Sequence, residues 1–341
     1  MDLRGASDHC KAEHVLITGG AGYIGSVLST HLLDAGHRVT VLDRFLFGPT
    51  LAHLANHRHL TLVEGDIRSV SRSVLDGVDA VCDLAALSND PAGELEPAET
   101  LSVNFEGRAR ICRLAREAGV RRYILASSCS LYGFQDGVVD EDSPINPLTT
   151  YARANALAEE ATLAESGPRF TVTALRQATV YGLSPRMRFD LAINGMVLSL
   201  FRTGRIRVMR DGSQWRPMIH VTDTARAFRT VLTADPKTVA GRIFNVGSDD
   251  QNLQIGPLSE RICRATGTAV VQDWYGDADT RSYRVAFRRA RDELGFVTRT
   301  APEEGAREIM AALRAHTVDT GPRTITVKWY RELGLGSVPG P

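Results

Sequence analysis

The clearest chemical signal in the chain lies between residues 15 and 43. An apolar run, 15–17, leads into a turn with four glycines in the segment 19–25, and an amphipathic stretch follows. Glycine lets the backbone turn tightly and brings its N–H groups close to a phosphate at a helix N-terminus. A second apolar run, 39–42, ends at Asp43, whose carboxylate suits a ribose 2′-hydroxyl. Strand, glycines, helix, strand and acid in this order predict a dinucleotide-binding site.

A second group of reactive side chains lies near the middle of the chain. Ser127 and Ser128 follow an apolar run, and Tyr151 begins a long helical pattern after Pro144 and Pro147. A serine hydroxyl and a tyrosine phenol at the open end of a nucleotide-binding sheet suit proton transfer coupled to hydride transfer.

These residues need a sheet that places them along one edge. Apolar runs predict strands near 14–18, 38–42, 60–64, 79–84, 121–127, 170–176 and 242–246. Helical patterns lie between most of these strands, notably at 23–35, 97–118, 148–166 and 222–233. This alternation predicts an α/β fold with a doubly wound parallel sheet of the Rossmann type. Ligands bind such sheets beyond the carboxyl ends of the strands, where the glycine-rich turn and Ser128 are expected to lie.

The regular alternation ends at about residue 182, and prolines separate the short mixed elements that follow. We therefore expect residues 1–182 to form the dinucleotide-binding domain, with about 219–247 returning to it. Residues 183–218 and 248–341 are expected to form a smaller C-terminal substrate-binding lobe.

The composition excludes several classes of protein. The chain has 341 residues, 43% of them hydrophobic, which is enough for a full core. Its 40 acidic and 40 basic side chains balance, so nothing indicates nucleic acid or a membrane surface as a partner. No apolar run is long enough to span a membrane, and the first thirteen residues are polar. Five cysteines without metal-ligand spacing indicate reduced thiols and no metal, so we expect a cytoplasmic protein.

Taken together, these motifs resemble the extended short-chain dehydrogenase/reductases, and within them the NAD-dependent nucleotide-sugar epimerase/dehydratase family. The resemblance extends over nearly the whole chain. It rests on these segments: the glycine-rich loop 18–25, Gly65-Asp66, 84–86, Val103-Asn104 with Gly107, 127–133, Tyr151 and 216–223.

The resemblance implies NAD as the cofactor and a nucleotide-diphosphate sugar as the substrate. It places the glycines at the cofactor's pyrophosphate, Asp43 at the adenosine ribose, and Asp66 with Ile67 beside the adenine. The expected cofactor-binding residues are Gly19, Gly22, Tyr23, Ile24, Gly25, Asp43, Asp66, Ile67, Ala85, Tyr151 and Asn155.

The resemblance assigns catalysis to Ser128, which hydrogen-bonds the substrate, and to Tyr151 as the acid–base group, with Asn155 beside them. The family has Tyr-x-x-x-Lys, and its lysine binds the nicotinamide ribose and lowers the pKa of the tyrosine. This chain has Asn155 at that position, and it has no lysine between Lys11 and Lys237. Asn155 is therefore expected to keep the ribose contact without supplying a charge.

The missing charge has a calculable cost. A free tyrosine has a pKa of about 10, so only ~0.1% is phenolate at pH 7, a deficit of about 4 kcal/mol. The positive nicotinamide ring or Arg153 would recover part of this. Arg153 is expected to face solvent, because positions 151 and 153 do not share a helix face.

Five further residues are expected to contact the substrate. By resemblance, Arg216 holds the diphosphate of the sugar nucleotide, and Thr179 replaces an asparagine that many relatives place against the same group. Arg281 and Arg284 are expected to close over this anion because guanidinium matches phosphate geometry. Arg188 is expected either to contact the substrate or to form a solvated surface, and the same two placements are open for Arg186.

The loop after Ser128 separates the reactions of the family. Cys129 and Ser130 occupy positions where dehydratases have Asp-Glu and decarboxylases have Glu at the second, so both reactions are disfavoured. The favoured function is NAD-dependent epimerisation of a nucleotide-diphosphate sugar, at C4, through a transient keto intermediate. The alternatives are an NAD(P)H-dependent nucleotide-sugar ketoreductase and a non-catalytic NAD-binding relative. The helices near 97–118 and 148–166 are expected to form a homodimer interface.

Overall fold

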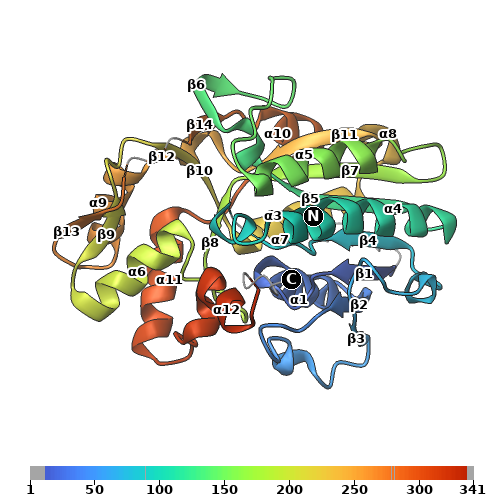
Figure 1. Ribbon diagram of the computed structural model, residues 1–341, viewed down its shortest axis with the longest axis horizontal. Coiled ribbons are helices and arrows are strands. Elements are labelled where there is room, and N and C mark those ends of the chain that lie inside the picture. Colours follow the sequence, from blue (N-terminus) through green and yellow to red (C-terminus); the bar gives the residue numbers. More distant parts are fainter. Residues whose placement is uncertain (1–11, 89, 278, 280, 336–341) are drawn as a thin grey trace, which may run out of the picture.

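A seven-stranded parallel sheet forms the centre of the molecule (Figure 1). The computed structural model describes residues 12–88, 90–277, 279 and 281–335. The strand order is β11-β7-β5-β4-β1-β2-β3. The bounds are β1 His14–Thr18, β2 Arg38–Asp43, β3 Leu60–Glu64, β4 Ala80–Asp83, β5 Arg122–Ser128, β7 Thr171–Gln177 and β11 Arg242–Val246. These are the seven strands that the apolar runs predict.

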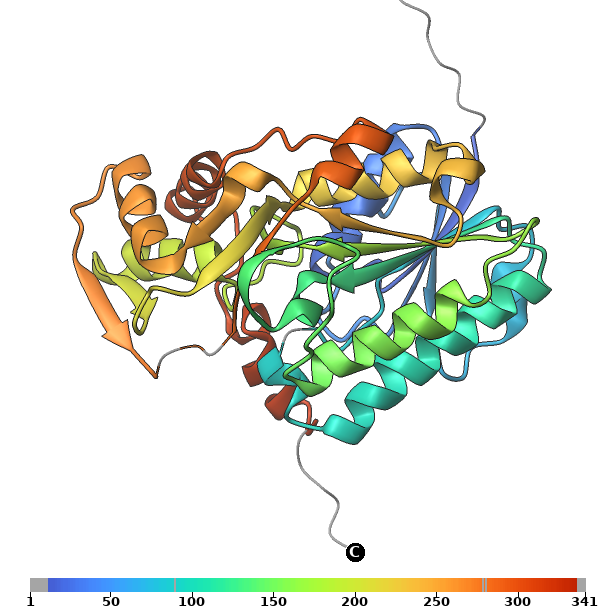
Figure 2. The same ribbon diagram turned by 90° about the horizontal axis from the view of Figure 1, so that it is seen from above.

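Helices cover both faces of this sheet, as Figure 2 shows from above. On one face lie α1 (Tyr23–Asp34) and α7 (Val221–Thr233), which pack against each other. On the opposite face lie α4 (Arg108–Glu117) and α5 (Thr150–Leu163). The expected doubly wound α/β fold is therefore confirmed.

The predicted helix at 97–118 is interrupted. It consists of α3 (Pro97–Leu101), a π-helical segment (Ser102–Gly107) and α4. The wider π turn gives buried Asn104 room to bond both backbone groups of Leu87: its Oδ1 accepts from the N–H at 2.8 Å and its Nδ2 donates to the carbonyl at 3.0 Å. Arg108 follows directly, and its side chain turns inward beneath the end of the sheet.

Among the remaining elements, α8 and α10 pack beside β11 of the main sheet, and most of the others lie at one end of the sheet (Figure 1). Three small sheets pair β12 with β10 and β8, β13 with β9, and β14 with β6. The strand bounds are β6 Phe134–Val139, β8 Thr179–Tyr181, β9 Ile206–Met209, β10 Trp215–His220, β12 Asn252–Gln254, β13 Gln272–Tyr275 and β14 Ser282–Val285. The helices are α2 Asp90–Gly93, α6 Ala192–Thr203, α8 Pro236–Val239, α9 Ile255–Ala265, α10 Arg288–Leu294, α11 Pro302–Arg314 and α12 Thr326–Glu332.

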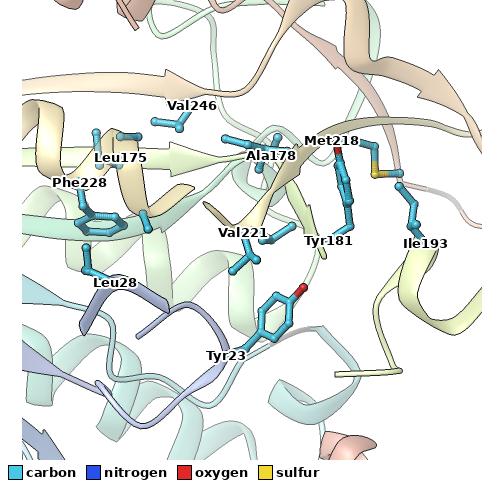
Figure 3. Packing of buried hydrophobic residues seen from close by; sticks show 14 of the residues in the cluster. Tyr23, Leu28, Leu175, Ala178, Tyr181, Ile193, Met218, Val221, Phe228 and Val246 are labelled. Carbon is cyan, nitrogen blue, oxygen red and sulfur yellow. The ribbon is translucent and has the colours of Figure 1, made fainter. Parts of the chain in front are cut away.

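One apolar core runs from the main sheet into these smaller elements. Leu28 and Phe228 pack between the two helices of one sheet face, and the same cluster continues through Tyr181 and Met218 to Ile193 (Figure 3). Strand β11 also returns to the main sheet beside β7. The proposed division into a cofactor domain and a substrate lobe stays a prediction, since the two parts share this core.

Candidate active site

A cavity of about 630 Å³ lies beyond the carboxyl ends of the central strands. Its wall includes every expected site residue except Arg284: Gly19, Gly22, Tyr23, Ile24, Gly25, Asp43, Asp66, Ile67, Ala85, Ser128, Tyr151, Asn155, Thr179, Arg188, Arg216 and Arg281. Their assignment to cofactor, catalysis or substrate remains a prediction.

Arg284 is not brought to this cavity. Its Nη2 donates to the Asp136 carbonyl at 3.2 Å, and its guanidinium lies 5.3 Å from the centre of the Trp215 ring. The reason is the pleat of β14, in which successive side chains point to opposite faces. The neighbouring Tyr283 is buried and lines the cavity, so Arg284 faces away from it.

The glycine-rich turn leaves space that any other residue would fill. Gly19 has φ +66°, and a Cβ there would lie 2.8 Å from the backbone of Ala85. A Cβ on Gly25 would collide with the carbonyl oxygen of Gly19. The N-terminus of α1 follows at Tyr23, so an electropositive helix end is directed at this space.

Two acidic residues, Asp43 and Asp66, line the part of the cavity where the adenosine of the cofactor is expected to bind. Asp43 accepts hydrogen bonds from the backbone N–H of Ala21 at 2.9 Å and of Phe45 at 2.8 Å, and burial raises the pKa of Asp43. Asp66 accepts from Arg68 Nη2 at 2.6 Å, and this hydrogen bond holds the pKa of Asp66 below its usual value. Asp43 thus has a fixed orientation and keeps free lone pairs for a ribose hydroxyl.

Tyr23 lies at the cavity wall but is mainly a structural link. Its hydroxyl donates to the Gly182 carbonyl at 2.7 Å and accepts from Asn194 Nδ2 at 3.0 Å. The residue is 6% exposed, and its bond to Asn194 joins α1 to the start of α6.

Arg186 is buried in the wall of the same cavity, so the solvated one of its two expected placements is wrong. Arg186 is 4% exposed, its Nη2 donates to Thr326 Oγ1 at 3.0 Å, and its guanidinium lies 3.7 Å from the centre of the Phe47 ring. Its Nε and Nη1 are buried and have no hydrogen-bond partner among the described residues. Burial lowers the pKa of Arg186 to about 9, and the charge of Arg188 acts in the same direction. Two unpartnered cationic donors in the cavity that the glycine turn also lines fit a diphosphate.

Ser128 and Tyr151 meet at the catalytic end of the cavity. Helix α5 begins just before Tyr151, because Thr149 Oγ1 caps it by accepting from the Ala152 N–H at 3.1 Å. Burial, and then the charge of Asp90, raises the pKa of Tyr151 above its ordinary value. The nearby Ser128 hydroxyl acts in the opposite direction and lowers the same pKa.

A residue that the sequence analysis missed, Arg108, stands beside Asn155. Its Nη1 donates to Asn155 Oδ1 at 2.9 Å, and both side chains are 1% exposed. The expectation that this position lacks a neighbouring cation is therefore wrong. Arg153 is exposed as expected, and its Nη2 donates to Thr150 Oγ1 at 3.1 Å.

The expected diphosphate-binding arginines are already paired with acids. Arg216 Nη2 lies 2.6 Å from Asp279 Oδ2, and Arg281 Nη2 lies 2.8 Å from the same oxygen. Arg281 also forms an ion pair with Asp90 on α2. A bound diphosphate would therefore compete with two carboxylates.

Arg188 does not form a solvated surface. It is 7% exposed, its Nη2 lies 3.0 Å from Asp190 Oδ2, and its Nη1 donates to Ser88 Oγ at 3.1 Å. Of its two expected placements, the solvated one is wrong.

Two polar atoms beside Ser128 are left for a ligand. Ser130 Oγ and Gln177 Oε1 are buried in the cavity wall without a hydrogen-bond partner among the described residues. Cys129 points the other way: its thiol is fully buried and lies 3.2 Å from the carbonyl oxygen of Arg176.

Within the described part of the chain, no group of three or more His, Cys, Asp or Glu side chains is arranged to hold a metal ion. No described helix is both long and apolar enough to cross a bilayer.

Fold and cavity together define an extended short-chain dehydrogenase/reductase. The chain belongs to the NAD-dependent epimerase/dehydratase family, whose model matches residues 15–247. NAD is its cofactor, and the glycine turn, Asp43 and the unpartnered nitrogens of Arg186 fit that group. Family membership makes it an NAD-dependent enzyme of nucleotide-sugar modification.

Relatives of known name differ in the reaction they catalyse. The chain is 29% identical to a UDP-glucose 4-epimerase of Corynebacterium glutamicum over 333 residues, covering 92% of this chain and 98% of that one. It is 28% identical to a dTDP-glucose 4,6-dehydratase of Streptomyces griseus over 317 residues, covering 89% and 94%. The structure of MoeE5 in complex with UDP-glucuronic acid and NAD matches with a TM-score of 0.80 at 30% identity, covering 89% of this chain and 99% of that one.

Proposed function

We propose that this enzyme epimerises a nucleotide-diphosphate sugar at C4 through a transient keto intermediate. The observation that carries the proposal is the surroundings of the Ser128–Tyr151 pair. Position 129 is a thiol turned into the core, and position 130 presents a hydroxyl to the cavity. Ser128 and Tyr151 can therefore carry out proton transfer at a sugar hydroxyl. The acidic side chain that relatives use for elimination or decarboxylation is missing at positions 129 and 130.

In the proposed reaction, Tyr151 and Ser128 have different roles. Tyr151 accepts the proton of the sugar hydroxyl, and Ser128 hydrogen-bonds the oxygen as the C–O bond becomes a carbonyl. Bound NAD would supply the hydride acceptor for the same carbon and the hydride donor for the return step. Tyr151 would then give the proton back to the oxygen, after the keto-sugar has turned to present its other face. Because the cofactor is regenerated in each cycle, we expect it to stay bound.

Substrate contacts are proposed at the diphosphate and at the sugar. Arg216 and Arg281 bind the diphosphate in place of Asp279 and Asp90, with Thr179 beside them. Arg188, Ser130 and Gln177 line the space next to Tyr151 and Ser128, where the sugar must lie for proton transfer. We also propose a homodimer through α4 and α5. Location in the cytoplasm stays a prediction.

A ketoreductase is the second candidate because the pKa of Tyr151 is raised. A neutral tyrosine donates a proton, which suits reduction of a ketone better than abstraction from an alcohol. A non-catalytic NAD-binding relative is the third candidate, and the intact pair of Ser128 and Tyr151 argues against it.

Incubation with UDP-glucose, UDP-glucuronic acid and dTDP-glucose distinguishes these activities. Epimerisation yields a product of unchanged mass without added cofactor, whereas a reductase requires added NAD(P)H. Release of CO₂ or formation of a 4-keto-6-deoxy sugar would contradict the interpretation of Cys129 and Ser130. Binding without turnover of any sugar nucleotide would favour the non-catalytic relative.

The enzyme is expected to bind NAD at least about tenfold more tightly than NADP, because the Asp43 carboxylate repels a 2′-phosphate at short range. Calorimetric titration of both cofactors measures the ratio. Asp43→Ser is expected to reduce it, since the charge is removed. Tighter binding of NADP by the unmodified enzyme would contradict this placement of Asp43.

Arg186→Met is expected to weaken NAD binding about tenfold or more, because hydrogen bonds from a buried charged donor to a diphosphate are lost. Arg284→Met serves as the matched control, since that guanidinium lies outside the cavity. Titration with adenosine should show no difference between Arg186→Met and the unmodified protein. Equal NAD affinity of the two variants would show that Arg186 has only a packing role.

A further inference from the structure

Asn155 is held from two sides. Its Oδ1 accepts from Arg108 Nη1 at 2.9 Å, and its Nδ2 donates to the backbone carbonyl of Tyr151 at 2.9 Å. The amide plane is therefore fixed, and one Nδ2 hydrogen remains for a ligand in the cavity. The two bonds connect α4 with the first turn of α5, which lie side by side on one face of the sheet (Figure 2).

Arg108 is itself fixed beneath the carboxyl ends of two strands. Its Nε donates to Asp83 Oδ2 at 3.0 Å, and its Nη2 donates to the carbonyls of Asp83 at 3.0 Å and Ala126 at 2.6 Å. With the bond to Asn155, these contacts use four of the five guanidinium N–H donors. The remaining hydrogen is on Nη1, the nitrogen that bonds Asn155.

The ion pair of Arg108 is oriented across the end of the sheet. Asp83 is fully buried, also accepts from the Tyr123 hydroxyl at 2.6 Å, and is not part of the cavity wall. Arg108 is part of that wall. The positive end of the pair therefore faces the cavity, and the negative end faces the core.

We propose that Arg108 is a positioning residue that takes the place of the family's Tyr-x-x-x-Lys lysine, orienting Asn155 toward the cofactor ribose and keeping a positive charge beside Tyr151. The proposal rests on the proposed function only in that Tyr151 is the acid–base group. In the family the cation lies on the same helix as the tyrosine, whereas here it lies on the neighbouring helix, α4.

The charges that face Tyr151 come from three other elements. Asp90 on α2 raises its pKa, and Arg108 on α4 and Arg188 before α6 lower it. Two of these groups have counter-ions near the cavity: Arg188 is paired with Asp190, and Asp90 with Arg281. Arg108 differs because its counter-ion lies on the core side, away from the tyrosine.

The test removes the cation together with its buried counter-ion, in Asp83→Asn/Arg108→Gln, so that no unpaired charge remains under the sheet. The ionisation of Tyr151 is followed in NAD-loaded protein by ultraviolet difference absorbance against Tyr151→Phe in the same background. NAD affinity is measured by calorimetry, and thermal unfolding checks the fold. We expect the midpoint of ionisation to rise by about half a pH unit or more. We expect NAD affinity to fall at least about fivefold.

Asn155→Ala separates the two roles. It removes the amide but keeps the cation, so NAD affinity is expected to fall by a similar factor while the midpoint moves by less than about 0.3 pH units. An unchanged midpoint in a folded Asp83→Asn/Arg108→Gln variant would overturn the proposal and leave Arg108 a purely structural partner of Asp83.

Arg108→Lys decides the case if the double variant does not fold. It keeps a charge beside Asp83 but lacks the second arm that reaches Asn155, so it should weaken NAD binding as Asn155→Ala does. Unchanged NAD affinity would contradict the proposal. Neither readout uses a sugar nucleotide, so a protein that shows these shifts without epimerase activity would reject only the proposed reaction.

Discussion

Tyr151→Phe is expected to lower turnover by about 10²- to 10⁴-fold, because it removes the group that exchanges a proton with the sugar hydroxyl. NAD affinity is expected to change by less than about twofold, since the phenol contributes more to the reaction than to cofactor affinity. Steady-state kinetics and calorimetric titration measure the two effects, with thermal unfolding as the check on folding.

The raised pKa of Tyr151 determines how turnover is expected to change with pH. Burial and Asp90 raise the pKa of Tyr151, and the deprotonated phenol is the form that accepts a proton. Turnover in the alcohol-oxidising direction should therefore increase with pH throughout the neutral range. A ketoreductase uses the protonated phenol, so its rate should fall at alkaline pH. A flat profile together with an active Tyr151→Phe enzyme would overturn the assignment of Tyr151.

Asn155→Lys is expected to destabilise the enzyme by about 3 kcal/mol, although it restores the family's motif. Position 155 is 1% exposed, so the new ammonium group would lie close to the guanidinium of Arg108, which would also lose its acceptor. Chemical denaturation measures the change in the free energy of unfolding. The motif alone favours the opposite result, a more active enzyme near neutral pH, and the buried cation reverses that expectation.

The double variant Asn155→Lys/Arg108→Gln completes a mutant cycle. If the two cations repel each other, adding Arg108→Gln to Asn155→Lys should recover part of the lost stability, so that the two changes are not additive. An Asn155→Lys enzyme as stable as the unmodified one would show that the site accommodates both charges, and that Arg108 does not fill the place of the lysine.

The sheet and the nucleotide turn could be predicted because their signals are local. Each of the seven strands is a short apolar run, and some glycines are required by close approaches within a few residues, as at Gly25, where a Cβ would collide with the carbonyl oxygen of Gly19. Family resemblance then identified Ser128 and Tyr151, which the fold brings together. The local sequence pattern was therefore sufficient to predict those parts of the structure that depend on residues close together in the sequence.

The buried arginines could not be predicted in this way. Most cations of this chain are arginines, so residue type does not separate Arg108 and Arg186 from those on the surface. Their roles depend on packing between elements far apart in sequence: Arg108 meets Asn155 only because α4 packs against α5, and Arg186 meets Thr326 only because α12 returns to the cofactor half. The prediction that Arg284 contacts the substrate was wrong for a related reason, since one residue of register on β14 decides which face of the strand its side chain occupies.

The most direct test of the proposed epimerisation follows a hydrogen atom. A sugar nucleotide deuterated at C4, such as UDP-glucose or UDP-glucuronic acid, is incubated with the purified enzyme in ordinary water without added cofactor, and the products are analysed by NMR and mass spectrometry. The proposed hydride transfer and return predict a C4 epimer that keeps its deuterium. Loss of the label to solvent, or product formed only when NAD(P)H is supplied in equal amount, would contradict it.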